Sequence, residues 1–134
     1  MQWSPDSAIY KQLADKISDY IMQGIYKDGD ILPSVRQISS EYEINHITVS
    51  KAYQTLTDLG VIEMKRGRGM YILEGGTEIL KQYKKTQFIE ITLPDIVKQM
   101  AILQLSEQEI MTAIQSIQSQ NDSLNTDKSN KEQP

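Results

Sequence analysis

The sequence predicts a mainly α-helical fold with one small β-hairpin, followed by a short helical region. Three observations lead to this prediction. Apolar residues recur at helical spacing in three segments before Gly60. Two short β-prone segments then flank a tip rich in glycine and arginine at residues 66–69. Beyond Gly75 and Gly76, two more amphipathic segments follow.

Length and composition favour one compact domain with a small appendage. The chain has 134 residues, of which 39% are hydrophobic and 24% charged, as in ordinary globular proteins. Cysteine is absent, which excludes disulfides and thiolate sites and fits a reducing compartment. The start, MQWSPDS, does not resemble a signal peptide, and no apolar run is long enough for a membrane span. We expect a cytoplasmic protein that does not enter membranes.

The first helix is predicted from an apolar residue at every fourth position. We expect these side chains to share one stripe: Ile9, Leu13, Ile17 and Ile21. Asp6 or Ser7 would cap the helix start, and Gly24 would end it. A turn at residues 27–30 follows, with Gly29 able to adopt a positive φ.

The second helix is predicted to begin at Ser34, because the residue before Pro33 avoids helical geometry. Ser34 and Gln37 have the spacing of a capping box, in which each side chain satisfies a backbone N–H of the first turn. The inward face would consist of Val35, Ile38 and Tyr42.

The third helix is predicted to follow a short connection, with Asn45 as its N-cap and Gly60 as its stop. Five apolar positions spaced by three and four face inward: Val49, Ala52, Tyr53, Leu56 and Leu59. His46, Ile47, Ser50 and Lys51 are left on the outside near the helix start.

A hairpin is predicted from residues 61–65 and 70–73, with Arg66 and Arg68 at its tip. The order helix, helix, helix, hairpin is that of a winged helix-turn-helix, which we assign to residues 1–75. In this motif the second helix of the helix-turn-helix enters the major groove of DNA. Because the net charge is -4, the DNA contacts must be local rather than spread over the surface.

Residues 76–120 are predicted to form a helical dimerisation region. One helix covers residues 77–105, and Pro94 either kinks it or restarts it. Ser106 and Glu109 form a second capping box for the next helix. These helices are too small to bury their apolar stripes alone, so they should pack on a partner copy or on the first domain. The candidate dimerisation residues are Leu80, Tyr83, Phe88, Ile96, Met100, Leu103, Ile110, Ile114 and Ile117. Residues 121–134 are polar and predicted to be a disordered tail.

Four short motifs resemble the GntR family of bacterial transcription regulators. They are LPSVR at residues 32–36, ITVSKAYQTL at 47–56, DLGVI at 58–62 and GRGMYI at 67–72. The short region after the hairpin resembles the YtrA-type branch of that family. This resemblance implies a homodimer that binds a roughly palindromic operator on double-stranded DNA and usually represses transcription.

The resemblance also implies which residues contact DNA. Arg36 matches the arginine of the family's LPS-x-R motif, and Arg66 and Gly67 match the wing tip that enters the minor groove. His46 and Ser50 occupy positions where several members have arginines that contact guanine, so the base preference of those members does not transfer. The full candidate set is Ser34, Arg36, Asn45, His46, Ile47, Thr48, Ser50, Lys51, Arg66, Gly67 and Arg68.

Other functions are less well supported by the residues. An enzyme or a metal site is disfavoured because His46 is the only histidine and cysteine is absent, and no cofactor motif is complete. One alternative is a winged helix that binds other proteins through the C-terminal helices. Another is a regulator switched by an unknown small-molecule effector bound near those helices.

Overall fold

The computed structural model describes residue 3 and residues 8–131, with side chains described as far as residue 125. The chain divides into two compact units, Met1–Gln87 and Phe88–Pro134. The first unit therefore extends beyond residue 75, where the first domain was predicted to end. The part of the chain that the structure describes contains no helix with the length and apolar character needed to cross a membrane.

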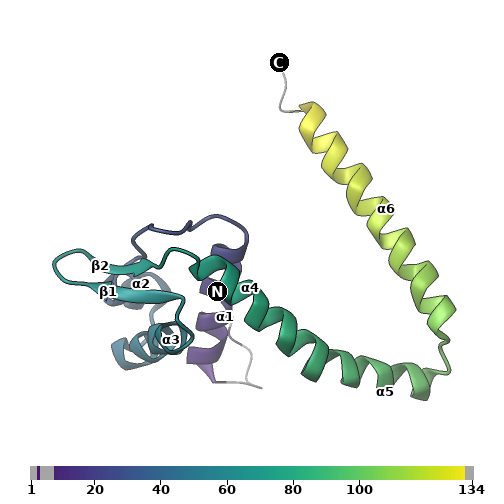
Figure 1. The fold of residues 1–134 in the computed structure, drawn as a ribbon, viewed down its shortest axis with the longest axis horizontal. Coiled ribbons are helices and arrows are strands. Elements are labelled where there is room, and N and C mark those ends of the chain that lie inside the picture. The colour runs from purple at the N-terminus through teal and green to yellow at the C-terminus, as the bar shows by residue number, and fades with distance from the viewer. Residues whose placement is uncertain (1–2, 4–7, 132–134) are drawn as a thin grey trace. The chain divides into compact units, whose positions relative to one another are not determined.

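The first unit is a winged helix-turn-helix, which confirms the predicted fold class. Helix α1 packs on α3 and α4, while α2 and the hairpin pack on α3. Figure 1 shows the loop between the two strands projecting away from the helices. The elements are α1 (Ile9–Met22), α2 (Val35–Tyr42), α3 (His46–Asp58), β1 (Ile62–Lys65), β2 (Gly69–Ile72) and α4 (Gly76–Gln87).

The core of the first unit contains most of the predicted apolar residues. Leu13, Ile17 and Ile21 are buried on α1, whereas Ile9 is 42% exposed, so its predicted place in the stripe was wrong. A spacing of four residues advances about 40° around a helix at each step, which turns Ile9 away from Ile21. The predicted caps at Asp6 and Ser7 lie outside the described residues. From α3 the core receives Val49, Ala52, Tyr53 and Leu56, with Leu59 half-buried.

Local hydrogen bonds fix the two helices of the helix-turn-helix. The backbone N–H of Gln37 donates to Ser34 Oγ at 3.1 Å, and the N–H of Ser34 donates to Gln37 Oε1 at 2.7 Å. Asn45 Oδ1 accepts from the N–H of Ile47 at 2.8 Å. The predicted capping box and N-cap are therefore confirmed. Between the helices, Glu43 adopts a left-handed φ of 54°, a conformation that glycine adopts more readily.

The hairpin contains one pairing that the sequence did not predict. Its two strands are antiparallel, with Ile62 opposite Ile72 and Lys65 opposite Gly69. Ile31 forms an additional antiparallel bridge to Tyr71. A single bridging residue two positions before Pro33 has too little pattern to be read as a strand.

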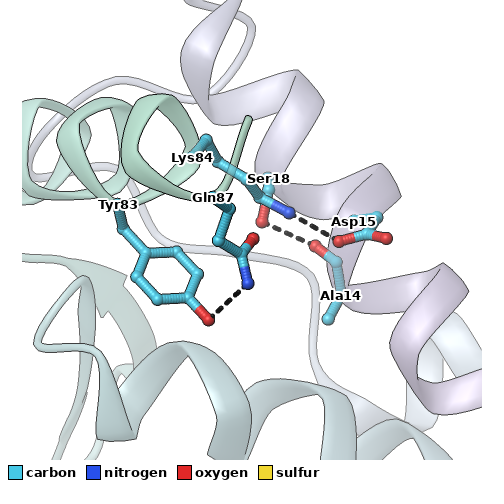
Figure 2. Close-up of polar contacts among 6 residues, drawn as sticks. All are labelled: Ala14, Asp15, Ser18, Tyr83, Lys84 and Gln87. Carbon is cyan, nitrogen blue, oxygen red and sulfur yellow. Dashed lines mark hydrogen bonds and ion pairs between the residues drawn. The ribbon is translucent and has the colours of Figure 1, made fainter. Parts of the chain in front are cut away.

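Helix α4 is held against α1 inside the first unit. Lys84 Nζ on α4 donates to Asp15 Oδ1 on α1 at 2.6 Å (Figure 2). Within α4, the side-chain amide of Gln87 donates to the hydroxyl of Tyr83 at 2.8 Å. Leu80 is fully buried in the core. It is therefore unavailable to a partner chain, and its predicted role in dimerisation was wrong because α4 uses its apolar face within the unit.

The second unit consists of a π-helical turn η1 (Phe88–Thr92), helix α5 (Leu93–Leu103) and helix α6 (Glu107–Lys131). Pro94 lies in the first turn of α5, directly after the π-helical turn. Because proline has no N–H to donate to an earlier carbonyl, the α-helical pattern is interrupted and restarts there. The second capping box is confirmed, since the N–H of Glu109 donates to Ser106 Oγ at 3.1 Å.

Two features of the second unit matter for assembly. Helix α6 continues to Lys131, through part of the segment predicted to be a disordered tail. Residues 121–131 contain no glycine or proline that would end the helix. Among residues 88–125, whose side chains are described, none is buried. The large apolar residues left exposed include Phe88, Ile91, Val97, Ile102, Leu103, Met111, Ile114 and Ile117.

Candidate nucleic-acid interface

The start of α3 presents an exposed edge of polar and apolar side chains. Ile47 is 76% exposed, and His46 and Ser50 are also exposed, while Thr48 is half-buried. The positive end of the helix dipole lies at the same place. An exposed β-branched side chain at a helix start fits contact with a thymine methyl group in the major groove.

A groove of about 520 Å³ runs between α2, α3 and the hairpin. Arg36 from α2, Ser50 from α3 and Arg68 from the hairpin all line it, although they come from three separate parts of the sequence. Both arginines are exposed. The groove thus combines two cations with the outward face of α3, an arrangement suited to a phosphate backbone beside base edges.

The tip of the hairpin concentrates positive charge on a tight turn. The N–H of Arg68 donates to the carbonyl of Lys65 at 2.9 Å, and Gly67 adopts a φ of 81°. Arg66 is exposed next to Gly67 but is not part of the groove lining. Lys65 was missed as a candidate, although it adjoins Arg66 in the sequence. Lys65 is exposed and adds a third cation next to the tip, with its Nζ 5.5 Å from the centroid of the Tyr71 ring on β2.

Three candidates already have partners within the protein. Lys51 Nζ lies 4.3 Å from the centroid of the Tyr10 ring, which directs this lysine toward α1. The side chains of Ser34 and Asn45 cap α2 and α3. These contacts give the three residues a structural role, and their DNA contacts stay predictions.

Other residues of the groove were not identified from the sequence. The wall includes Gln54 from α3, Met64 from β1 and Met70 from β2. Met64 is 62% exposed and gives the groove wall an apolar side chain open to solvent. The available sequence signal for Met64 was the alternation of side chains between the two faces of a strand. This alternation does not show which face borders the groove unless the position of the neighbouring helix is known.

The described side chains offer little for catalysis by a metal. No group of three or more histidine, cysteine, aspartate or glutamate residues among them lies close enough to hold a metal ion. The exposed cations and the helix edge instead fit the binding of a polyanion.

Comparisons with known proteins agree with this geometry. A model of the bacterial regulatory proteins of the gntR family matches residues 9–72. The HTH-type transcriptional regulator YhcF of Bacillus subtilis is 33% identical over 115 residues, which cover 86% of this chain and 93% of that protein. The chain belongs to the GntR family.

Two further comparisons concern the fold of the chain and its branch within the GntR family. The HTH-type transcriptional repressor YtrA of B. subtilis is 43% identical over 82 residues, or 61% of this chain and 63% of that repressor, slightly less than two thirds of its length. A GntR family regulator from Listeria monocytogenes superimposes with a TM-score of 0.72 at 28% identity, covering 85% of this chain and 98% of that one. The predicted resemblance to the YtrA-type branch is thereby confirmed. The chain is a DNA-binding transcription regulator and not an enzyme.

Proposed function

We propose that this GntR-family chain is a cytoplasmic repressor that acts as a homodimer on a roughly palindromic operator. The observation that carries the proposal is the convergence of Arg36, Ser50 and Arg68 on one groove beside the exposed Ile47. Repression is proposed because the relative YtrA is named a repressor. In each half-site α3 would read bases in the major groove, and the hairpin tip would enter the adjacent minor groove.

Dimerisation is proposed to use the second unit. Its exposed apolar residues recur along η1, α5 and α6, and exposed apolar surface of this kind marks contacts with another protein. Of the predicted dimerisation residues, Phe88, Leu103, Ile114 and Ile117 are exposed, and Ile96, Met100 and Ile110 are half-buried. Tyr83 lies on α4 in the first unit and is 39% exposed, and its role in dimerisation stays a prediction. Two copies would place two α3 edges on one operator, which raises both affinity and specificity.

The test of the proposed function is selection of DNA from a random pool by the full chain. The expected result is an enriched sequence with two related half-sites in inverted orientation. A pool without enrichment would overturn sequence-specific binding. Enrichment of a single half-site would overturn the palindromic operator.

Salt dependence separates DNA binding from the alternative of a protein-interaction module. If four cations in each of two copies contact phosphate, affinity should fall by on the order of 10³ to 10⁵ between about 50 and 200 mM salt. The four are Arg36, Lys65, Arg66 and Arg68. An affinity for the selected DNA that is insensitive to salt would contradict the proposal.

The dimer is tested by sedimentation of paired variants on α6. Ile114→Glu should shift the protein toward monomer, because a charge would enter an apolar interface. Thr112→Glu, an exposed position on the same helix, is the matched control and should remain dimeric. A wild-type chain that sediments as a monomer at micromolar concentration would exclude the homodimer.

A further inference from the structure

The first unit contains a pocket of about 240 Å³ that the DNA interface does not use. It lies between α1, α2 and the connection that joins them. Buried Leu13, Ile17 and Ile38 line it, together with the rings of four tyrosines. The tyrosines are Tyr20, Tyr26, Tyr42 and Tyr53.

The volume sets the size of the molecule that fits. An apolar cavity of about 150 Å³ in another protein binds benzene, and drug-sized ligands need about 300 Å³ or more. A pocket of 240 Å³ lies between these values. It therefore suits one aromatic ring with a small substituent.

The walls favour an aromatic ligand over an aliphatic one. The rings of Tyr20 and Tyr26 already meet edge to face, with centroids 6.1 Å apart and planes inclined by 82°. A ligand ring can join such a pair through the same edge-to-face geometry. Burial, with the neighbouring Tyr20 and the Glu41 carboxylate, raises the pKa of the Tyr26 hydroxyl. Burial, followed by Glu41, raises the pKa of Tyr42 as well. Both residues line the pocket, and the side chain of Tyr42 also forms a hydrogen bond with that of Tyr20.

The pocket is connected to the DNA interface through one side chain. Tyr53 on α3 lines both the pocket and the groove that holds Arg36 and Arg68. Its hydroxyl donates a hydrogen bond to the carbonyl of Pro33, the residue just before the cap of α2. Pro33 lines the pocket too. A ligand that moves Tyr53 or Pro33 would change how α2 and α3 are placed against each other.

We propose that this tyrosine-lined pocket binds a small single-ring aromatic molecule, and that its occupancy changes DNA affinity through Tyr53 and Pro33. The pocket lies wholly within the first unit and differs in place from a ligand site near the C-terminal helices. Binding itself does not depend on the proposed repressor function. The effect on DNA affinity rests on that function.

Binding is tested on the full chain by titration with phenol while the backbone amide signals are followed by nuclear magnetic resonance. We expect a dissociation constant of about 1 mM, in the range of small fragments, with the largest shifts at Tyr20, Tyr26 and Tyr42. Cyclohexanol, of similar size but without an aromatic ring, should bind more weakly. Absence of phenol binding, or equal affinity for cyclohexanol, would overturn the proposed site or its aromatic class.

A filled pocket provides the control variant. Ile25 lines the pocket and is 57% exposed, so Ile25→Trp can fill the space without disturbing the core. This change should weaken phenol binding about tenfold or more, because the volume is no longer free. Ile79→Trp makes the same exchange at an exposed site on α4 outside the pocket, and should bind phenol as the wild type does. Unchanged phenol binding by Ile25→Trp would place the site elsewhere.

Coupling is tested by measuring affinity for the selected operator with and without saturating phenol. The expected change is about fivefold or more in the wild type and in Ile79→Trp, and none in Ile25→Trp. Equal affinities in the wild type would overturn the coupling. If selection returns no operator, the proposed function fails while phenol binding still decides whether the pocket is a site.

Discussion

The carboxylate of Asp28 accepts two hydrogen bonds from Thr77, one from the hydroxyl at 2.6 Å and one from the backbone N–H at 3.1 Å. It accepts a third from the N–H of Gly75 at 2.9 Å. Asp28 lies in the connection between α1 and α2, and Thr77 lies in the first turn of α4. This carboxylate therefore ties two distant parts of the first unit together and satisfies N–H groups at the helix start.

Asp28→Asn should destabilise the first unit in a pH-dependent way. The hydrogen bond from the Thr77 side chain contributes most to lowering the pKa of Asp28 below its ordinary value. A lowered pKa in the folded state stabilises the protein above the unfolded pKa of about 4, and this stabilisation disappears as pH falls through the folded pKa. We expect a loss of about 1 kcal/mol near neutral pH, allowing for solvent screening, and no loss well below pH 4.

Denaturant unfolding at several pH values measures this effect. Asp19→Asn changes an exposed carboxylate on α1 and serves as the control, with a stability close to that of the wild type throughout. A loss in Asp28→Asn that stays constant down to low pH would show that ionisation of Asp28 is not its source.

Gly76→Ala should destabilise the first unit through a steric clash. A Cβ at position 76 would lie 2.5 Å from the carbonyl oxygen of Val61, a backbone atom that cannot rotate away. The expected cost is about 2 to 3 kcal/mol, as for an overpacked core. Gly24→Ala is the comparison, because Gly24 has open space around it but a positive φ of 83°. Its cost should be about 1 kcal/mol. Equal costs in chemical denaturation would argue against the clash.

Ile47→Ala should change which bases are preferred rather than the overall strength of binding. The exposed Ile47 side chain can contact a thymine methyl group, a contact that carries about 1 kcal/mol of discrimination. Binding to a panel of operators with single half-site changes measures this preference. A uniform loss across the whole panel would refute the assigned role of Ile47 in base recognition.

Arg66→Ala should weaken binding to every sequence by a similar factor. The hairpin tip is expected to contact backbone and minor groove, which carry little sequence information. The slope of log affinity against log salt should fall by about 1 for each lost contact, or about 2 for a dimer. Lys65→Ala tests the third cation in the same way. Glu63→Gln, at an exposed position of β1, is a control that should leave the slope unchanged.

Local patterns made much of the fold predictable, because caps and periodic burial act over a few residues. Ser34 with Gln37 and Asn45 before His46 set the starts of α2 and α3, and the structure shows their hydrogen bonds. The burial of Leu80 within the first unit was not predictable, since an apolar stripe on a helix does not show which surface will cover it. The bridge between Ile31 and Tyr71 depends on partners 40 positions apart in the numbering, a separation that local pattern does not report.

The candidate site also combines residues that the sequence identified with contacts that it could not predict. Motif residues such as Arg36 and Arg68 could be named from the sequence, but their meeting in one groove depends on how α2, α3 and the hairpin pack. Lys51 on α3 contacts the ring of Tyr10 on α1, and the spacing of residues along α3 could not predict this tertiary contact. The tyrosine pocket was missed because its rings come from α1, α2, α3 and a connection, without a shared sequence motif.

The cations at the hairpin tip stand in contrast to the overall charge of the chain, which is -4. A molecule with this asymmetry rotates as it approaches a polyanion, because most orientations are repelled and those that lead with the tip are attracted. The tip would then act before α3 contacts any base, because it favours encounters in which the protein approaches DNA in the correct orientation. Neutralising it would slow association with DNA, while the dissociation of complexes already seated on α3 would change less.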